Sequence, residues 1–261
     1  MLVGSLVDAL DERFPFRRAA SWDPVGLQLG AANADVGSVS VCHEVTPDVA
    51  RTCLETGVDT LVSYHPLLFD PVTSIVDGPT AEGTALRLLG GSISLVVVHT
   101  AMDVAEGGTG DQLADALGVK VEGHFAETEV GVEDWIGRFG VLTRKTTLSE
   151  FSQDVARALG SDVRVSHSTD TTVTKVAVVP GSGSSFTSEA AALADVYVTG
   201  DIGHHSVQTA TRLGFAVIDA GHIPTERPGV KHLYDVVRKI APNAEFVRID
   251  PHPWEGVSWS P

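Results

Sequence analysis

Short apolar runs rich in valine and isoleucine recur along this chain, and they alternate with segments whose apolar residues have helical spacing. Residues 36–45 and 59–66 are two such runs, each predicted to contain a strand, and a helical pattern lies between them. A strand, a helix and a second strand in that order favour a parallel strand pair joined by the helix. This alternation predicts an α/β protein, because parallel strands need crossover helices on their faces.

Two helix starts carry specific capping signals. Thr46 is expected as an N-cap with Pro47 at the first helical position, and this helix is expected to run to about Gly57. Thr147 and Glu150 have the spacing of a capping box, in which each residue satisfies a backbone N–H of the other. These signals place helices in both halves of the chain.

One glycine-interrupted stretch carries a local signal for metal binding. Residues 215–218 have the aromatic and β-branched content of a buried strand, and Gly221 ends it. Pro224 is expected at the first position of the next helix, so His222 lies just outside that helix and Glu226 in its first turn. An imidazole and a carboxylate this close can share one divalent cation. The alternative is an exposed histidine and a glutamate that favours the helix dipole.

Histidines and carboxylates follow four separate predicted strands. In an open α/β sheet the carboxyl ends of parallel strands meet at one edge, so groups distant in sequence are expected to meet in one crevice. The groups are His65, His99 with Asp103, His204 with His205, and His222 with Glu226.

Histidines and carboxylates without thiolates suit zinc, iron, manganese or nickel, and the sequence does not choose among these metals. With enough carboxylate to bridge, such a site holds two ions about 3.5–4 Å apart, which polarise a substrate oxygen and generate hydroxide near neutral pH. The chemistry indicated is hydrolysis. His204 and His205 open a predicted helix, so they are expected as ligands, as hydrogen-bond donors to ligands or as solvated side chains, and proton shuttling is the catalytic role that suits them.

An acidic, poorly periodic stretch at residues 122–134 is the expected boundary between two lobes. A chain of 261 residues is long enough for two compact lobes. We therefore expect a first α/β lobe over residues 1–125 and a second lobe over residues 126–261, which completes the metal site.

The charge balance excludes several classes of partner. The net charge is −16 and neither lysine nor arginine is clustered, which argues against binding to nucleic acid or to an anionic membrane surface. No apolar run approaches the length of a bilayer span and no secretory signal pattern begins the sequence, so a cytoplasmic location is expected. Cys42 and Cys53 are expected to be reduced thiols.

Several short motifs together carry a family resemblance that spans nearly the whole chain. By these motifs the chain resembles the NGG-one-interacting-factor-three-like family, whose members are also called GTP cyclohydrolase I type 2 homologs. The matching stretches are residues 22–30 (Trp-Asp-Pro-Val-Gly-Leu-Gln-Leu-Gly), 63–69 (Ser-Tyr-His-Pro-Leu-Leu-Phe), 99–103 (His-Thr-Ala-Met-Asp), 181–184 (Gly-Ser-Gly-Ser), 199–201 (Thr-Gly-Asp) with His204-His205, and 219–222 (Asp-Ala-Gly-His) with Glu226.

The resemblance implies two similar lobes with mixed sheets flanked by helices, a dinuclear metal centre between the lobes at strand carboxyl ends, and a ring-shaped homohexamer. It implies that Glu226 bridges the ions and that His99 lies close by. The other implied ligands are His65, Asp103 and His222.

The family pattern has two adjacent histidines where this chain has Tyr64-His65. A neutral phenol is a poor ligand, because its reference pKa is about 10. Tyr64 therefore stands at the position of a ligand to the second metal, and the sequence leaves open whether it binds that metal. Two alternatives follow. Either His99 or a water molecule takes the ligand position of the missing histidine, or the site holds one ion firmly and another weakly.

Two functions from different classes follow. The first is a metal-dependent hydrolase that acts on a nucleotide-like small molecule, with GTP cyclohydrolase-type ring opening as the named possibility. The second is a non-enzymatic hexameric protein that binds metal or serves as an adaptor. Both predict bound divalent metal, and only turnover of a defined substrate separates them.

Overall fold

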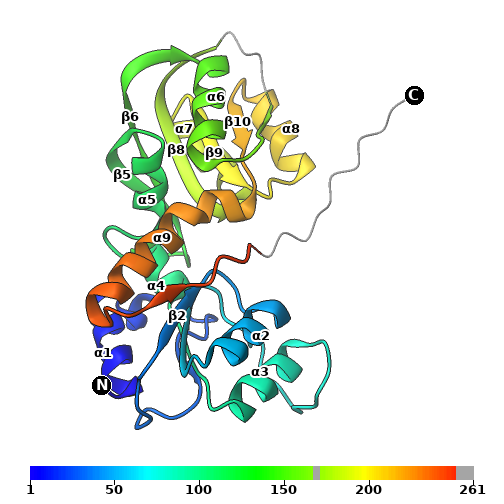
Figure 1. Cartoon of the computed structure of the whole chain (residues 1–261). Coiled ribbons are helices and arrows are strands. Elements are labelled where there is room, and N and C mark those ends of the chain that lie inside the picture. Colours follow the sequence, from blue (N-terminus) through cyan, green and yellow to red (C-terminus); the bar gives the residue numbers. More distant parts are fainter. Residues whose placement is uncertain (167–170, 251–261) are drawn as a thin grey trace.

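The structure is a computed structural model that describes residues 1–166 and 171–250 (Figure 1). Two sheets lie one beyond the other in Figure 1, and the long helix α9, His222–Ile240, runs between them. Both sheets are mixed and flanked by helices, which confirms the predicted α/β class.

The first sheet has the strand order β1-β4-β3-β2-β11. Its strands β2, β3, β4 and β11 are parallel, and β1 pairs antiparallel with β4 at one edge. The predicted parallel pair is confirmed, because β2 and β3 are neighbours in register. The bounds are β1 Gly26–Leu29, β2 Val39–Cys42, β3 Thr60–Ser63, β4 Ser94–Val97 and β11 Glu245–Phe246.

Helices cover both faces of the first sheet. Successive strand residues point to opposite faces, so Leu61 packs with α2 and α3, whereas Val62 packs with α1 and α9. Both faces are therefore buried, as expected for central parallel strands. The bounds are α1 Val3–Arg13, η1 Phe16–Arg18, α2 Pro47–Thr56, α3 Ala81–Gly90 and α4 His99–Asp103.

The second sheet has the order β5-β6-β8-β9-β10-β7, with β8, β9 and β10 parallel. Helices α5 and α6 pack on one face, and α7 and α8 on the other. The strands are β5 Val119–Glu127, β6 Trp135–Thr147, β7 Arg164–Val165, β8 Thr172–Ser182, β9 Val196–Gly200 and β10 Ala216–Asp219. The helices are α5 Thr109–Ala116, α6 Leu148–Leu159, η2 Ser184–Phe186, α7 Thr187–Leu193 and α8 His204–Arg212.

The predicted helix starts are confirmed, with one correction. Thr46 accepts a hydrogen bond from Val49 N–H, and Thr147 forms the complete capping box. The predictions that His222 lies just outside the last long helix and that Glu226 lies in its first turn are wrong, because α9 begins at His222 and its first turn contains no acidic residue. Pro224 therefore occupies the third helical position, where its missing N–H still costs no intrahelical bond.

The strands do not divide at the boundary predicted from composition. Residue 125 lies inside β5, which continues through the acidic stretch as far as Glu127 and belongs to the second sheet. Strand β11, near the other end of the described chain, returns to the first sheet. The division at residue 125 stays a prediction about domains.

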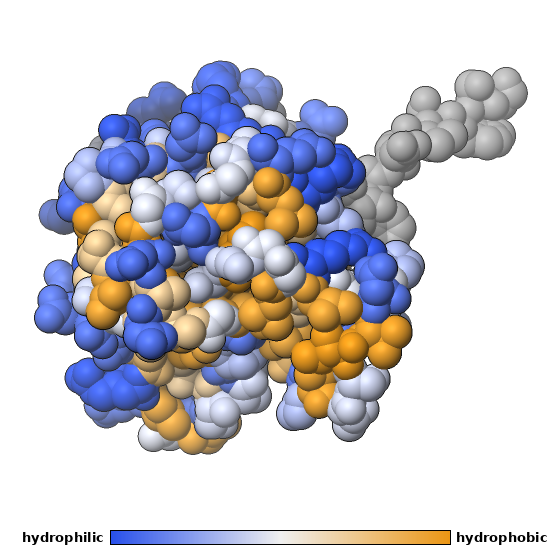
Figure 2. All heavy atoms as spheres, turned by 60° about the horizontal axis from the view of Figure 1, so that its bottom comes forward, coloured by the Kyte–Doolittle hydropathy of each residue, from blue (hydrophilic) through white to orange (hydrophobic). Residues whose placement is uncertain are grey.

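Large apolar side chains are exposed between β3 and α3 and on α3 itself. Figure 2 shows the face at the bottom of Figure 1, where apolar surface gathers in patches between hydrophilic residues. None of the helices in the described parts of the chain combines the length and apolar composition needed to cross a membrane. The exposed residues of this region are Phe69, Val72, Ile75, Val76, Leu86 and Leu89.

Candidate metal centre

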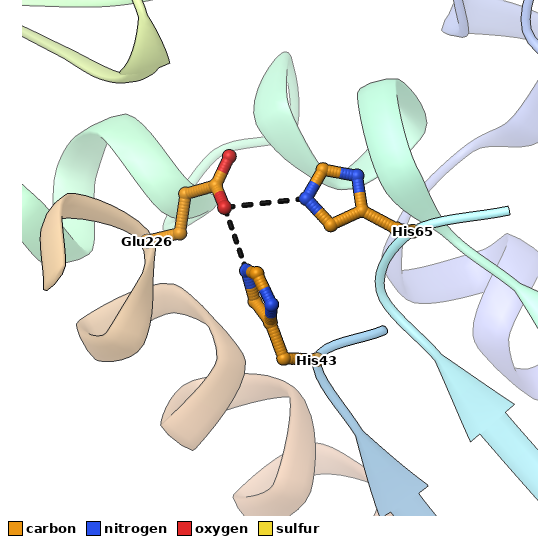
Figure 3. A group of neighbouring side chains, drawn as sticks. All are labelled: His43, His65 and Glu226. Atoms are coloured by element: carbon orange, nitrogen blue, oxygen red, sulfur yellow. Dashed lines mark hydrogen bonds and ion pairs between the residues drawn. The ribbon is translucent and has the colours of Figure 1, made fainter. Parts of the chain in front are cut away.

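Three side chains from three elements converge on one point (Figure 3). His43 follows β2 directly, His65 lies two residues after β3, and Glu226 projects from α9. Glu226 Oε2 lies 2.6 Å from His43 Nε2 and 3.2 Å from His65 Nε2. The ligand atoms of all three residues lie within 4.8 Å of one another, which suits a shared divalent cation.

His222 approaches the other oxygen of the same carboxylate. Its Nε2 atom lies 3.1 Å from Glu226 Oε1, and its Nδ1 atom lies 2.9 Å from an oxygen of Asp201, just after β9. The pair predicted from spacing therefore meets in space, and three imidazoles surround one carboxylate. Asp201 orients the ring of His222, as carboxylates do for metal-binding histidines.

The burial of this cluster makes its charges strongly interdependent. Glu226 is 3% exposed and His43 is 5% exposed. Burial alone would raise the pKa of the Glu226 carboxyl, but hydrogen bonds from His222, His43 and His65 outweigh it and hold that pKa well below its usual value. The hydrogen bond to Glu226 raises the pKa of His222 to about 9. In the metal-free protein a proton thus supplies positive charge that a cation would otherwise bring.

The backbone around the carboxylate and the donor set fit a bound ion at this place. Gly181, near the end of β8, has φ +67°, and a Cβ there would lie 2.5 Å from Glu226 Oε1. Only glycine lets the backbone approach the carboxylate this closely. Two imidazoles and a carboxylate are also a suitable donor set for a divalent ion.

Tyr64 and Asp103 form a separate network beside the cluster. The Tyr64 hydroxyl donates to Asp103 Oδ1 at 2.7 Å, and the Thr109 hydroxyl donates to the same oxygen. Tyr64 is 2% exposed, and burial together with the charges of Asp103 and Glu226 raises its pKa well above the usual value. The phenol is therefore a neutral donor to Asp103. Burial also raises the pKa of Asp103.

His99 lies beside the cluster, and a hydrogen bond with Asp23 orients its ring. Its ring centroid is 4.8 Å from that of His65, and its Nδ1 atom lies 2.9 Å from Asp23 Oδ1. The other oxygen of Asp23 accepts from the backbone N–H of Thr100 at 2.9 Å. The hydrogen bond to Asp23 occupies Nδ1, so Nε2 is the ring atom left for other partners.

His204 and His205 lie apart from this group. Both are exposed in the first turn of α8, and their ring centroids are 5.5 Å apart. His204 lines a neighbouring cavity of about 290 Å³, which shares Arg164, Ile202 and Asp219 with the larger cavity at the cluster. Neither belongs to the candidate metal group found among the described residues. Their proton-shuttle role stays a prediction.

A cavity of about 960 Å³ gives the cluster access to a small molecule. His43, His65 and His222 are on its wall, together with Phe69. The sequence reasoning missed His43. The signal was a histidine at a strand end, as at the other sites, but the strand was expected to continue through Val45 and therefore hid it.

The family model of Duf34/NIF3 (NGG1p interacting factor 3) matches residues 1–253. A protein of Clostridium perfringens named GTP cyclohydrolase 1 type 2 homolog is 26% identical over 250 residues, covering 95% of this chain and 95% of that protein. A protein of the same name from Streptomyces coelicolor is 32% identical over 233 residues, covering 87% of this chain and 82% of that protein.

Solved structures agree with the sequence comparisons. The hypothetical protein SA1388 of Staphylococcus aureus has 27% identity and a TM-score of 0.87, covering 98% of this chain and 99% of that chain. Reduced HcgD from Methanocaldococcus jannaschii has 25% identity and a TM-score of 0.82, covering 95% of this chain and 98% of that chain. The family match, the named relatives and the shared fold all extend over most of the chain. The chain therefore belongs to the Duf34/NIF3 (NGG1p interacting factor 3) family.

Proposed function

We propose that this protein binds a divalent metal and acts as a metal-dependent hydrolase on a nucleotide-like substrate. The observation that carries the proposal is the cluster of His43, His65 and Glu226 with its ligand atoms within 4.8 Å, on the wall of a large cavity. The name GTP cyclohydrolase 1 type 2 homolog, carried by several relatives, supports ring opening of a purine as the reaction.

His43, His65 and Glu226 would hold the ion, with His222 on the far oxygen of the carboxylate. A divalent cation supplies Lewis-acid chemistry, because it polarises a substrate oxygen and lowers the pKa of a water molecule. The side chains around the ion hold the histidines in their orientations. Asp201 holds His222, and Asp23 holds His99 beside His65, where we propose that His99 Nε2 exchanges a proton with the substrate.

The number of ions depends on Tyr64. The resemblance implies two metal ions per chain, with Asp103 as a ligand. However, Asp103 Oδ1 already accepts hydrogen bonds from Tyr64 and Thr109. A buried neutral phenol does not replace an imidazole as a ligand. We propose that one ion is held firmly at His43, His65 and Glu226, and that a second ion near Asp103 and His99 is held weakly.

The decisive experiment combines metal content with turnover. Protein purified without chelators or affinity metals is analysed for metal and incubated with a broad panel of nucleotides, beside Glu226→Gln and the control Glu55→Gln. Glu55 is 69% exposed on α2, so its variant should match wild type. Glu226→Gln should lose both metal and turnover. If metal-loaded wild type turned over no nucleotide, the hydrolase proposal would fail.

The second candidate is a protein that stores or delivers the metal without turnover, or serves as an adaptor. The exposed position of His204 and His205 favours it, because the predicted proton shuttles are not members of the candidate metal group. In that case Glu226→Gln would lose metal while neither protein turned over any nucleotide.

We also propose a homohexamer, as the resemblance implies. The exposed apolar residues between β3 and α3 and on α3, other than Phe69, support burial against further copies, because contiguous apolar surface often marks an interaction site. They are Val72, Ile75, Val76, Leu86 and Leu89. Light scattering coupled to size-exclusion chromatography should give six chains per particle.

A further inference from the structure

Two large aromatic side chains are exposed beside the metal cluster. Trp22 is 52% exposed and Phe69 is 49% exposed, and their ring centroids lie 5.5 Å apart at an interplanar angle of 37°. The His99 ring lies 6.2 Å from Trp22 and 6.4 Å from Phe69. Phe69 lines the large cavity, and ring contacts connect Trp22 to Phe69 and His99 to His65 of the cluster.

The segments that carry these two rings are tied down by hydrogen bonds. On one side of Trp22, Ala20 N–H donates to the Thr100 hydroxyl at 3.0 Å, and on the other side Asp23 is bonded to Thr100. Before Phe69, the backbone N–H groups of Leu67 and Leu68 donate to the side-chain oxygen of Gln28 at 2.9 and 2.8 Å. Rings held in place lose little entropy when a ligand stacks on them.

Apart from a bound metal ion and the imidazoles, the side chains that line the cavity disfavour a polyphosphate. Arg164 is the only lysine or arginine among the described lining residues, and its guanidinium is already paired with Asp219. The net charge of −16 adds a repulsive field for anions. An uncharged ring meets no such penalty. The carboxylates that line the cavity are Glu44, Asp162, Asp201 and Asp219.

We propose that the cavity recognises an uncharged planar heteroaromatic ring, a nucleobase or nucleoside in preference to a nucleoside triphosphate, which stacks on Trp22 and Phe69. The inference rests on the proposed function, because it takes this cavity to be the substrate site, and it narrows the nucleotide-like substrate to one without a polyphosphate. Stacking supplies the affinity, since every base has a π-face that stacks on an aromatic side chain.

The test is equilibrium dialysis of the zinc-loaded full chain against guanosine, GMP and GTP at fixed ionic strength. Guanosine should bind roughly tenfold or more tightly than GTP. Trp22→Ala should weaken guanosine binding about tenfold, and Trp22→Phe should keep most of it. Leu213→Ala, at an exposed apolar position after α8, should bind as wild type. Zinc content is measured in every variant, so that loss of stacking is separated from loss of metal.

Three results would overturn the inference: tighter binding of GTP than of guanosine, an unchanged guanosine affinity in Trp22→Ala, or no guanosine binding by zinc-loaded wild type. These outcomes are independent of catalysis. Guanosine binding that depends on Trp22 without any turnover would leave the inference standing and count against the hydrolase proposal. Turnover of GTP that does not depend on Trp22 would support the hydrolase proposal and count against the inference.

Discussion

His43 Nε2 lies 2.6 Å from Glu226 Oε2, although the two residues are 183 positions apart in the sequence. The contact joins the end of β2 in the first sheet to α9, which follows β10 of the second sheet. Both residues are buried, so the contact has no water to compensate either partner if the other is removed. The candidate centre thus exists only when α9 is packed against the first sheet.

We expect His43→Ala to weaken zinc binding by more than roughly 100-fold, because even the loss of an outer hydrogen-bond partner of a ligand costs 10–100-fold. Competition with a chromophoric chelator measures the affinity. The matched control is His124→Ala, because His124 stacks on Trp135 and is outside the cluster. Equal zinc affinity in His43→Ala and wild type would remove His43 from the ligand set.

Tyr64→His should raise the number of ions per chain from one to two, because an imidazole replaces the phenol that now donates to Asp103. Elemental analysis gives the stoichiometry. Tyr64→Phe is the control, since it removes the hydroxyl without adding a ligand and should stay at one ion. Two firmly bound ions in wild type would show that Tyr64 does not limit the centre.

The metal-free protein should lose stability as the pH rises from about 6.5 to about 9. The pKa of His222 is raised from 6.5 to about 9 by its hydrogen bond to Glu226. A raised folded-state pKa gives stabilisation that is fully present below the unfolded pKa and is lost as the pH passes the folded pKa. Thermal unfolding in chelator at several pH values measures the effect. His222→Ala should flatten this part of the profile, and an equal slope in both proteins would contradict the assignment.

Gly181→Ala should lower zinc affinity as well as stability. Its added Cβ would lie 2.5 Å from Glu226 Oε1, and the backbone has φ +67°. Gly57 is a matched control, because it has φ +71° but open space around the Cβ position. Both variants should pay about 1–2 kcal/mol for the left-handed backbone, seen in denaturant unfolding, whereas only Gly181→Ala should change zinc binding. Unchanged zinc affinity in both would mean that the carboxylate tolerates displacement.

Local rules in the sequence predicted much of this fold. The caps at Thr46 and Thr147, the helix end at Gly57 and the parallel pair of β2 and β3 are all observed. Each depends on residues within a few positions of one another or on periodicity of 3.6 or 2 residues. The motif resemblance added the family, which the comparisons confirm.

Part of the centre could also be predicted. The spacing of His222 and Glu226 on one helix start brings Nε2 to 3.1 Å from Oε1, and His65 follows a recognisable strand. These contacts follow from local geometry and from the rule that parallel strands end at one edge.

Only the tertiary structure decided the remaining members of the site. His43 becomes a candidate ligand because β2 ends next to β3 and α9 crosses from the second sheet to the first. Tyr64 becomes a donor to Asp103, and Asp23 fixes His99, because burial forces each polar group to find a partner. Periodicity and capping act within a few residues, whereas which strand ends meet, and which side chains lose their water, depends on how the whole chain packs.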